Sequence, residues 1–149
     1  MANTKEIIIL ILVLFTAVVL SYIFYSGPFV YYDDNYYILS AHQMLQGTFR
    51  PSGIPFTVET LTIASIALSF LLFGYGPLQA ALPSLVEYLA TIIVIFFLGR
   101  KMFNGYFGGA ASFLYATAPF VVGYTTRSLP DIFTGLTVAH AITYTKQLN

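Results

Sequence analysis

The sequence predicts an all-α, polytopic helical membrane protein, with about four full transmembrane helices and further helices on its outer face. Of the 149 residues, 58% are hydrophobic and only 8% are charged, whereas a soluble domain carries about 25% charged residues. Several apolar segments are long enough to cross a hydrocarbon core of about 30 Å as helices. The length suits one unit, so residues 1–149 are treated as a single membrane domain.

The charge balance and the missing residue types exclude several classes of function. Six basic and six acidic residues cancel and no basic run occurs, so we expect no nucleic acid partner. The absence of cysteine excludes disulfides, zinc knuckles and thiol nucleophiles. The sequence also contains no P-loop, GxSxG or GxGxxG motif, and therefore nothing that indicates nucleotide or esterase chemistry.

Four apolar segments are predicted to span the membrane, over residues 7–25, 82–99, 105–124 and 129–145. The first is interpreted as an uncleaved anchor, because it is long for a signal peptide and ends without a small-residue cleavage site. In the third, Gly105 and Gly109 form a GxxxG motif. The same surface of small side chains is expected to be widened by Gly108, Ala111 and Ser112, so that a neighbouring helix can pack closely.

An outer-face loop is predicted over residues 26–56, with a surface helix at about 34–46. Asp33 is expected to be the N-cap of this helix and Asp34 to favour its positive end, while Gly47 closes it. Its apolar side, which includes Tyr37 and Ala41, should rest on the membrane surface.

Residues 57–73 are apolar enough to cross the membrane, but Glu59, Thr62, Ser65 and Ser69 form one polar stripe. This pattern is typical of an interfacial, re-entrant or bundle-lining helix, and an additional span is the alternative. If the segment does not cross, Lys5, Arg100, Lys101 and Lys146 all lie on the cytoplasmic side, in agreement with the positive-inside tendency. The sequence therefore predicts a multi-pass protein of the cell membrane with a cytoplasmic N-terminus.

Two groups of charged residues are candidates for a reaction site. The adjacent carboxylates Asp33 and Asp34 can accept a proton from a hydroxyl group or hold a divalent cation, and the alternative is that they only stabilise the helix start. Arg127 can bind a phosphate group while Asp131 orients an acceptor molecule. The alternative is that Arg127 and Asp131 only form a local ion pair with each other. A divalent cation is the one cofactor that these residues leave open, and no second His or Glu has the spacing to form a metal ligand set with His140.

Several short motifs occur in a characteristic order along nearly the whole chain. The order resembles the N-terminal module of GT-C glycosyltransferases, especially protein O-mannosyltransferases and aminoarabinose transferases that modify lipid A. The motifs that carry this resemblance are Asp33-Asp34-Asn-Tyr-Tyr37, Met44-Leu45-Gln-Gly47, Leu72-Phe73-Gly74, Ala81-Leu82-Pro83-Ser84, Leu98-Gly99-Arg100-Lys101-Met-Phe103, Pro119, Arg127 and Pro130-Asp131.

The resemblance implies transfer of a sugar from a polyprenyl-phosphate carrier to an acceptor on the outer face, with inversion. It implies that Asp33 is the catalytic base, that Asp34 supports it and that Asp131 occupies a second acidic position. Arg127, Tyr37 and Arg50 are the residues expected to bind the substrate or its phosphate. The lipid-linked donor and membrane lipid are the implied partners.

Two departures from the family pattern leave alternatives open. Ala81 stands where the family has Arg, and family members continue through several more spans after the point that corresponds to Asn149. The chain alone is therefore expected to be incomplete, and a second membrane subunit could complete it. The alternatives are a non-catalytic small membrane protein or partner subunit, and a small transporter that uses Glu87 and His140.

Overall fold

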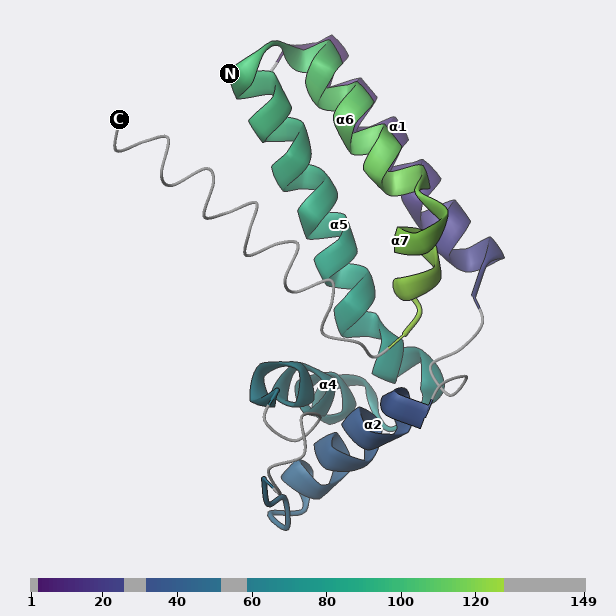
Figure 1. Cartoon of the computed structure of the whole chain (residues 1–149), viewed down its shortest axis with the longest axis vertical. Helices are drawn as coiled ribbons and strands as arrows, with labels where there is room; N and C mark the ends of the chain where they lie inside the picture. Colours follow the sequence, from purple (N-terminus) through teal and green to yellow (C-terminus); the bar gives the residue numbers. More distant parts are fainter. Residues whose placement is uncertain (1–2, 26–31, 52–58, 128–149) are drawn as a thin grey trace, which may run out of the picture.

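The computed structural model describes residues 3–25, 32–51 and 59–127, and this part of the chain is all-helical. The all-α expectation is thus confirmed. Two helices, α1 and α5, are long and apolar enough to cross a membrane. The predicted span over 129–145 lies outside the described residues. The helices in chain order are α1 (Thr4–Ile23), α2 (Tyr32–Leu45), α4 (Thr60–Phe73), α5 (Pro77–Met102), α6 (Gly105–Thr117) and α7 (Pro119–Tyr124) (Figure 1).

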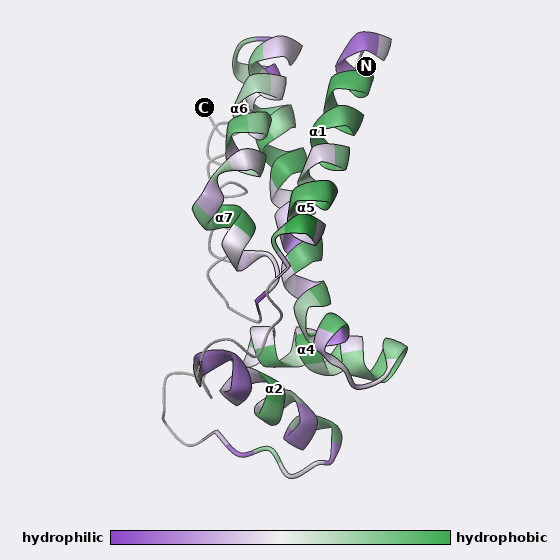
Figure 2. Cartoon of the chain, turned by 90° about the vertical axis from the view of Figure 1, so that its right-hand side faces the viewer, coloured by the Kyte–Doolittle hydropathy of each residue, from purple (hydrophilic) through white to green (hydrophobic). Residues whose placement is uncertain are grey.

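The helices form an upright bundle with a crosswise pair at one end. Helices α1, α5 and α6 run side by side, and α7 follows α6 toward the lower end of the bundle (Figure 1). Helices α2 and α4 pack against each other and lie across the bundle at the end opposite the N-terminus of α1 (Figure 2). The apolar α1 and α5 contrast with α2, whose first and last turns are hydrophilic (Figure 2).

The upper end of the bundle is fixed by an ion pair between α1 and α5. Asn3 caps α1, and the Glu6 side chain accepts a hydrogen bond from the Asn3 backbone N–H, which completes a capping box. The Arg100 Nε lies 3.0 Å from the Glu6 Oε2. The exposed side chains of Lys5 and Lys101 lie next to these residues in the sequence. Three of the six Lys and Arg residues therefore gather at this end.

Helices α5 and α6 approach each other at glycines. A Cβ atom added to Gly108 would lie 2.4 Å from the carbonyl oxygen of Phe96, so only glycine allows the backbones to pack this closely. Gly109 instead faces α1, because a Cβ there would lie 2.5 Å from the Ile9 side chain. The glycines of α6 thus allow close packing against two helices, α5 and α1. The expectation for Ala111 is wrong, since it is exposed.

The apolar segment 105–124 is not one continuous helix. It divides into α6 and α7 at Ala118, whose backbone is extended with a ψ of 119°. The cause is Pro119, because a proline ring clashes with a helical conformation of the preceding residue and supplies no backbone N–H. Pro119 then begins α7, a position that suits proline.

Each of the two layers has its own core. In the bundle, Tyr88 is buried between helices, and its hydroxyl donates to the Ala116 carbonyl oxygen (2.6 Å). In the crosswise pair, the apolar side of α2 packs against α4 through Tyr37 and Ala41. The expectation that this side rests on the membrane surface is therefore wrong. The bundle core consists of Val13, Ala17, Tyr88, Ile92 and Ala116.

The glycine contact gives a matched pair of substitutions. We expect Gly108→Ala to lower the free energy of unfolding by about 1–3 kcal/mol, because the new methyl group meets the α5 backbone. Gly123→Ala is the control, since a Cβ there meets nothing within 4 Å, and it should leave stability unchanged or slightly raised. Circular dichroism during unfolding in detergent measures both. Equal stabilities for the two variants would contradict the close packing.

Candidate functional site

The acidic pair lies in the first turn of α2. The helix begins at Tyr32, so Asp33 is inside the helix, and the expectation that it is the N-cap is wrong. The helix start favours both negative charges. The two side chains differ in their exposure to solvent, because Asp34 is 0% exposed whereas Asp33 is half-buried. Asp33 is therefore the carboxylate that a reactant can approach, and Asp34 belongs to the interior of the protein.

The other end of α2 is closed by Gly47, as the sequence predicts. Gly47 has a φ of +69°, which glycine adopts without strain. The Thr48 N–H donates to the Gln43 carbonyl oxygen (3.0 Å) and the Gly47 N–H to that of Met44 (3.2 Å), which is the Schellman arrangement. Arg50 follows this turn and is exposed. It lies at the opposite end of α2 from Asp33, so the structure does not bring Arg50 to the acidic pair.

Tyr37 connects the acidic end of α2 to the start of α4. Its side chain is 2% exposed, and its hydroxyl donates to the Glu59 carboxylate. Residues three and four apart share one face of a helix, so Tyr37 lies on the same side of α2 as Asp33 and Asp34. The bond therefore fixes the rotation of α2 about its axis. Sequence reasoning did not assign Glu59 to the site, although the polar stripe that it begins was a signal.

The same stripe holds α4 against α5. Thr62 and Ser69 are buried, and the Ser69 hydroxyl donates to the Gln79 carbonyl oxygen in the first turn of α5 (2.6 Å). Thr62 and Ser69 of the stripe thus face the protein, whereas Ser65 is part-buried. The stripe keeps the crosswise pair attached to the end of the bundle.

Arg127 lies just beyond α7, at the same end of the bundle as α2. Its guanidinium carbon is 4.9 Å from the centroid of the Tyr124 ring, within range of a cation–π contact. The Thr125 hydroxyl donates to the Val122 carbonyl oxygen (2.8 Å) and lies 3.2 Å from the Ser21 Oγ. This contact joins residues 104 positions apart, for which no local sequence signal exists. It holds the segment before Arg127 against the end of α1.

A cavity of about 380 Å³ lies beside this segment, between α1 and α5. Ala81, which stands at the family's Arg position, lines it together with Thr126, the neighbour of Arg127. The remaining lining is mostly apolar, which suits an aliphatic chain better than a sugar. The other lining residues are Val18, Ser21, Tyr22, Tyr25, Leu78, Leu82, Leu85 and Thr125.

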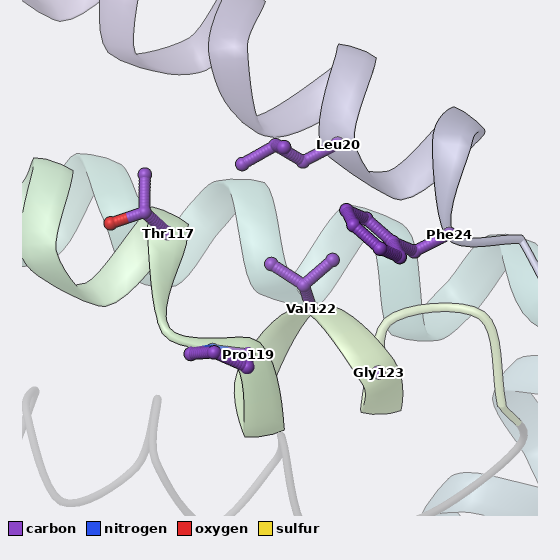
Figure 3. Close-up of a pocket in the computed structure, with 6 residues that line it drawn as sticks. All are labelled: Leu20, Phe24, Thr117, Pro119, Val122 and Gly123. Carbon is purple, nitrogen blue, oxygen red and sulfur yellow. The ribbon is translucent and has the colours of Figure 1, made fainter.

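A second cavity, of about 290 Å³, lies where the helix breaks at Pro119 (Figure 3). Leu20 of α1 and Phe24, the residue that follows α1, face Val122 of α7 across it, and Thr117 lies at its edge (Figure 3). No titratable side chain is among its described lining residues. It therefore offers no acid or base for a reaction.

The structure brings only part of the predicted site to one end of the bundle. Helix α2 and the end of α7 lie at this end, opposite the N-terminus of α1 (Figure 1). Helix α2 contains Asp33, Asp34 and Tyr37, and Arg127 follows α7. Asp131 and His140 lie outside the described residues. Within the described ranges, no group of three or more His, Asp or Glu side chains comes together as a metal site.

The bond between Tyr37 and Glu59 can be tested by its effect on α2. We expect Tyr37→Phe to reduce the stability of the crosswise pair by about 1–3 kcal/mol, because it leaves a carboxylate without its donor. Amide hydrogen exchange in α2 should become faster, while exchange in α5 remains as in the wild type. Glu59→Gln is the control, since an amide oxygen still accepts the bond. Unchanged exchange in Tyr37→Phe would contradict the role of this bond.

Comparison with known proteins places the chain in a family. The model of the dolichyl-phosphate-mannose-protein mannosyltransferase family matches residues 61–148. No curated protein and no solved structure matches the chain. The match covers more than half of the sequence, includes the motifs at 81–84 and 98–103, and begins after the acidic pair of α2. The resemblance to GT-C glycosyltransferases is thereby confirmed, and the chain belongs to the dolichyl-phosphate-mannose-protein mannosyltransferase family.

Proposed function

We propose that this chain is a membrane module that transfers a sugar from a polyprenyl-phosphate donor to an acceptor on the outer face, with inversion. The family name indicates mannose as the sugar and a protein as the acceptor. The observation that supports a site in this chain is the acidic first turn of α2, which the crosswise pair holds at one end of an apolar bundle.

The proposed chemistry begins with Asp33. Its half-exposed carboxylate accepts the proton of the acceptor hydroxyl while the hydroxyl oxygen attacks the anomeric carbon of the sugar. The bond between that carbon and the phosphate oxygen breaks, and the polyprenyl phosphate leaves with the electron pair. Attack from the face opposite the leaving group inverts the configuration. Asp34 and Tyr37 keep the first turn of α2 in place.

The leaving phosphate requires positive charge, because negative charge develops on its oxygen in the transition state. In this chain Ala81 replaces the family Arg. Arg127 follows Thr126, which lines the same cavity as Ala81. Arg127 therefore takes the role of the phosphate ligand in this proposal, with the polyprenyl chain in the apolar cavity beside it. Asp131 supplies the second acidic position, and Arg50 has no role near Asp33.

The proposed orientation places the end with Glu6 and Arg100 in the cytoplasm and the crosswise pair at the outer surface. The cations Lys5, Arg100 and Lys101 at one end agree with the positive-inside tendency. The crosswise direction of α4 supports an interfacial helix rather than an additional span (Figure 2). Residues 105–124 and 129–145 provide the further spans of the multi-pass arrangement.

A partner subunit is the second candidate function. Among the described residues, the cavities beside Arg127 and Pro119 are not lined by an acidic side chain, so neither of them encloses a sugar beside Asp33. A following segment or a second membrane subunit would have to complete the pocket. In a non-catalytic subunit, Asp33 would only stabilise the start of α2.

Substitution of Asp33 separates the two candidates. We expect Asp33→Asn to abolish mannose transfer from dolichyl-phosphate-mannose to a hydroxyl-bearing peptide in membranes where the assembly is active, because the amide cannot accept the proton. Membrane insertion should be unchanged. Lys101→Gln removes an exposed charge at the other end and should retain transfer. Undiminished transfer by Asp33→Asn, with only a loss of up to about 1 kcal/mol in stability, would favour the non-catalytic subunit.

The orientation can be measured by labelling, because the chain contains no native cysteine. A cysteine introduced at the exposed Gln46 should react with a membrane-impermeant maleimide added to intact cells. A cysteine at the exposed Phe103 should react only after the membrane is permeabilised. The reverse pattern, or labelling of both positions in intact cells, would contradict the proposed orientation.

A further inference from the structure

Glu87 is a buried acidic residue that the proposed reaction does not use. It lies about 15 Å along α5 from Pro77, and its side chain is only 8% exposed. Its Oε2 atom has no hydrogen-bond partner within the described residues. The Thr91 hydroxyl donates to the Glu87 backbone carbonyl (2.8 Å) and not to the carboxylate. An acidic side chain inside a membrane helix is costly and normally has a partner.

Glu87 lines a groove of about 330 Å³ between α4 and α5. Leu68 and Leu72 of α4 and Val86 of α5 contribute to its walls, and all three side chains are exposed. The groove therefore opens outward from the helix pair, with Glu87 and Ser69 as its buried polar members. It shares the lining residue Leu82 with the cavity beside Arg127 and shares none with the cavity at Pro119.

The polar groups of this groove accept hydrogen bonds. The Ser65 hydroxyl already donates to the Thr62 carbonyl oxygen (2.8 Å), and the Ser69 hydroxyl donates to that of Gln79 (2.6 Å). Their oxygen lone pairs and the Oε2 atom of Glu87 remain as acceptors. An occupant that matches the groove therefore combines an apolar body with a positively charged donor.

We propose that the groove binds a transmembrane helix from outside this chain, which places a Lys or Arg side chain against Glu87. Lipid acyl chains carry no donor at the depth of Glu87, whereas a helix can present one there. The spans predicted within these 149 residues do not present one, because every basic side chain of the sequence lies outside them. The basic residues are Lys5, Arg50, Arg100, Lys101, Arg127 and Lys146.

Designed transmembrane peptides test this inference independently of any transferase activity. One peptide is a poly-leucine helix with a single Lys about 15 Å below its outer end, as Glu87 lies below Pro77, and the matched peptide has Leu there. Energy transfer between labelled peptide and labelled chain in phosphatidylcholine vesicles measures association. We expect the Lys peptide to bind the wild type about tenfold more tightly than it binds Glu87→Leu. The Leu peptide should bind both equally and weakly.

A second pair of variants tests the groove without removing Glu87. Leu68→Trp fills the groove and should weaken binding of the Lys peptide, whereas Leu71→Trp adds the same bulk at an exposed position that does not line it. If Glu87→Leu fails to fold, this pair decides the result. Three results would each overturn the proposal. The two peptides could bind equally, the two tryptophan variants could have equal effects, or the chain could associate with itself in a way that depends on Glu87.

Discussion

The close approach of α5 and α6 is the contact on which the rest of the structure depends. A Cβ on Gly99 would lie 2.8 Å from the Gly108 Cα, so the two helices meet backbone to backbone. Within a membrane such contacts are favourable because van der Waals packing, and not burial from water, holds helices together. The contact sets the position of α6, and α1 then packs on its other glycine face at Gly109. The start of α5 and the segment after α7 consequently meet at one end.

The two ends of this bundle differ in chemistry. One end contains the ion pair between Glu6 and Arg100, and the cationic residues Lys5 and Lys101 are their neighbours in the sequence. The other end carries α2 and α4, the acidic pair, Arg127 and apolar cavities. Tyr37 and Glu59 lock the crosswise pair, and Ser69 attaches it to α5. A carboxylate such as Asp33 is thus held at a fixed place beside an apolar phase, as a reaction between a lipid-linked donor and a polar acceptor requires.

Local sequence patterns predicted the features that depend on neighbouring residues. The apolar side of α2, the turn at Gly47 and the polar stripe of α4 follow from helical periodicity and glycine conformation. The sequence also contained Pro119 and the glycines of α6, but it could not show which neighbour each glycine meets, and Ala111 was therefore misplaced. The contact between Ser21 and Thr125, and the bond between Tyr37 and Glu59, join distant residues. Such pairs become visible only once the helices are packed.

The most direct test of this arrangement is the depth of α4 in a lipid bilayer. Single spin labels at the exposed positions Leu61, Leu68, Leu71 and Leu72 report depth by their relative accessibility to oxygen and to a water-soluble nickel complex. A helix that lies along the outer surface predicts a periodic variation about one constant depth. A depth that increases steadily, by about 1.5 Å per residue from Leu61 to Leu72, would mean that α4 crosses the membrane. The acidic pair and Arg127 would then lie on opposite faces.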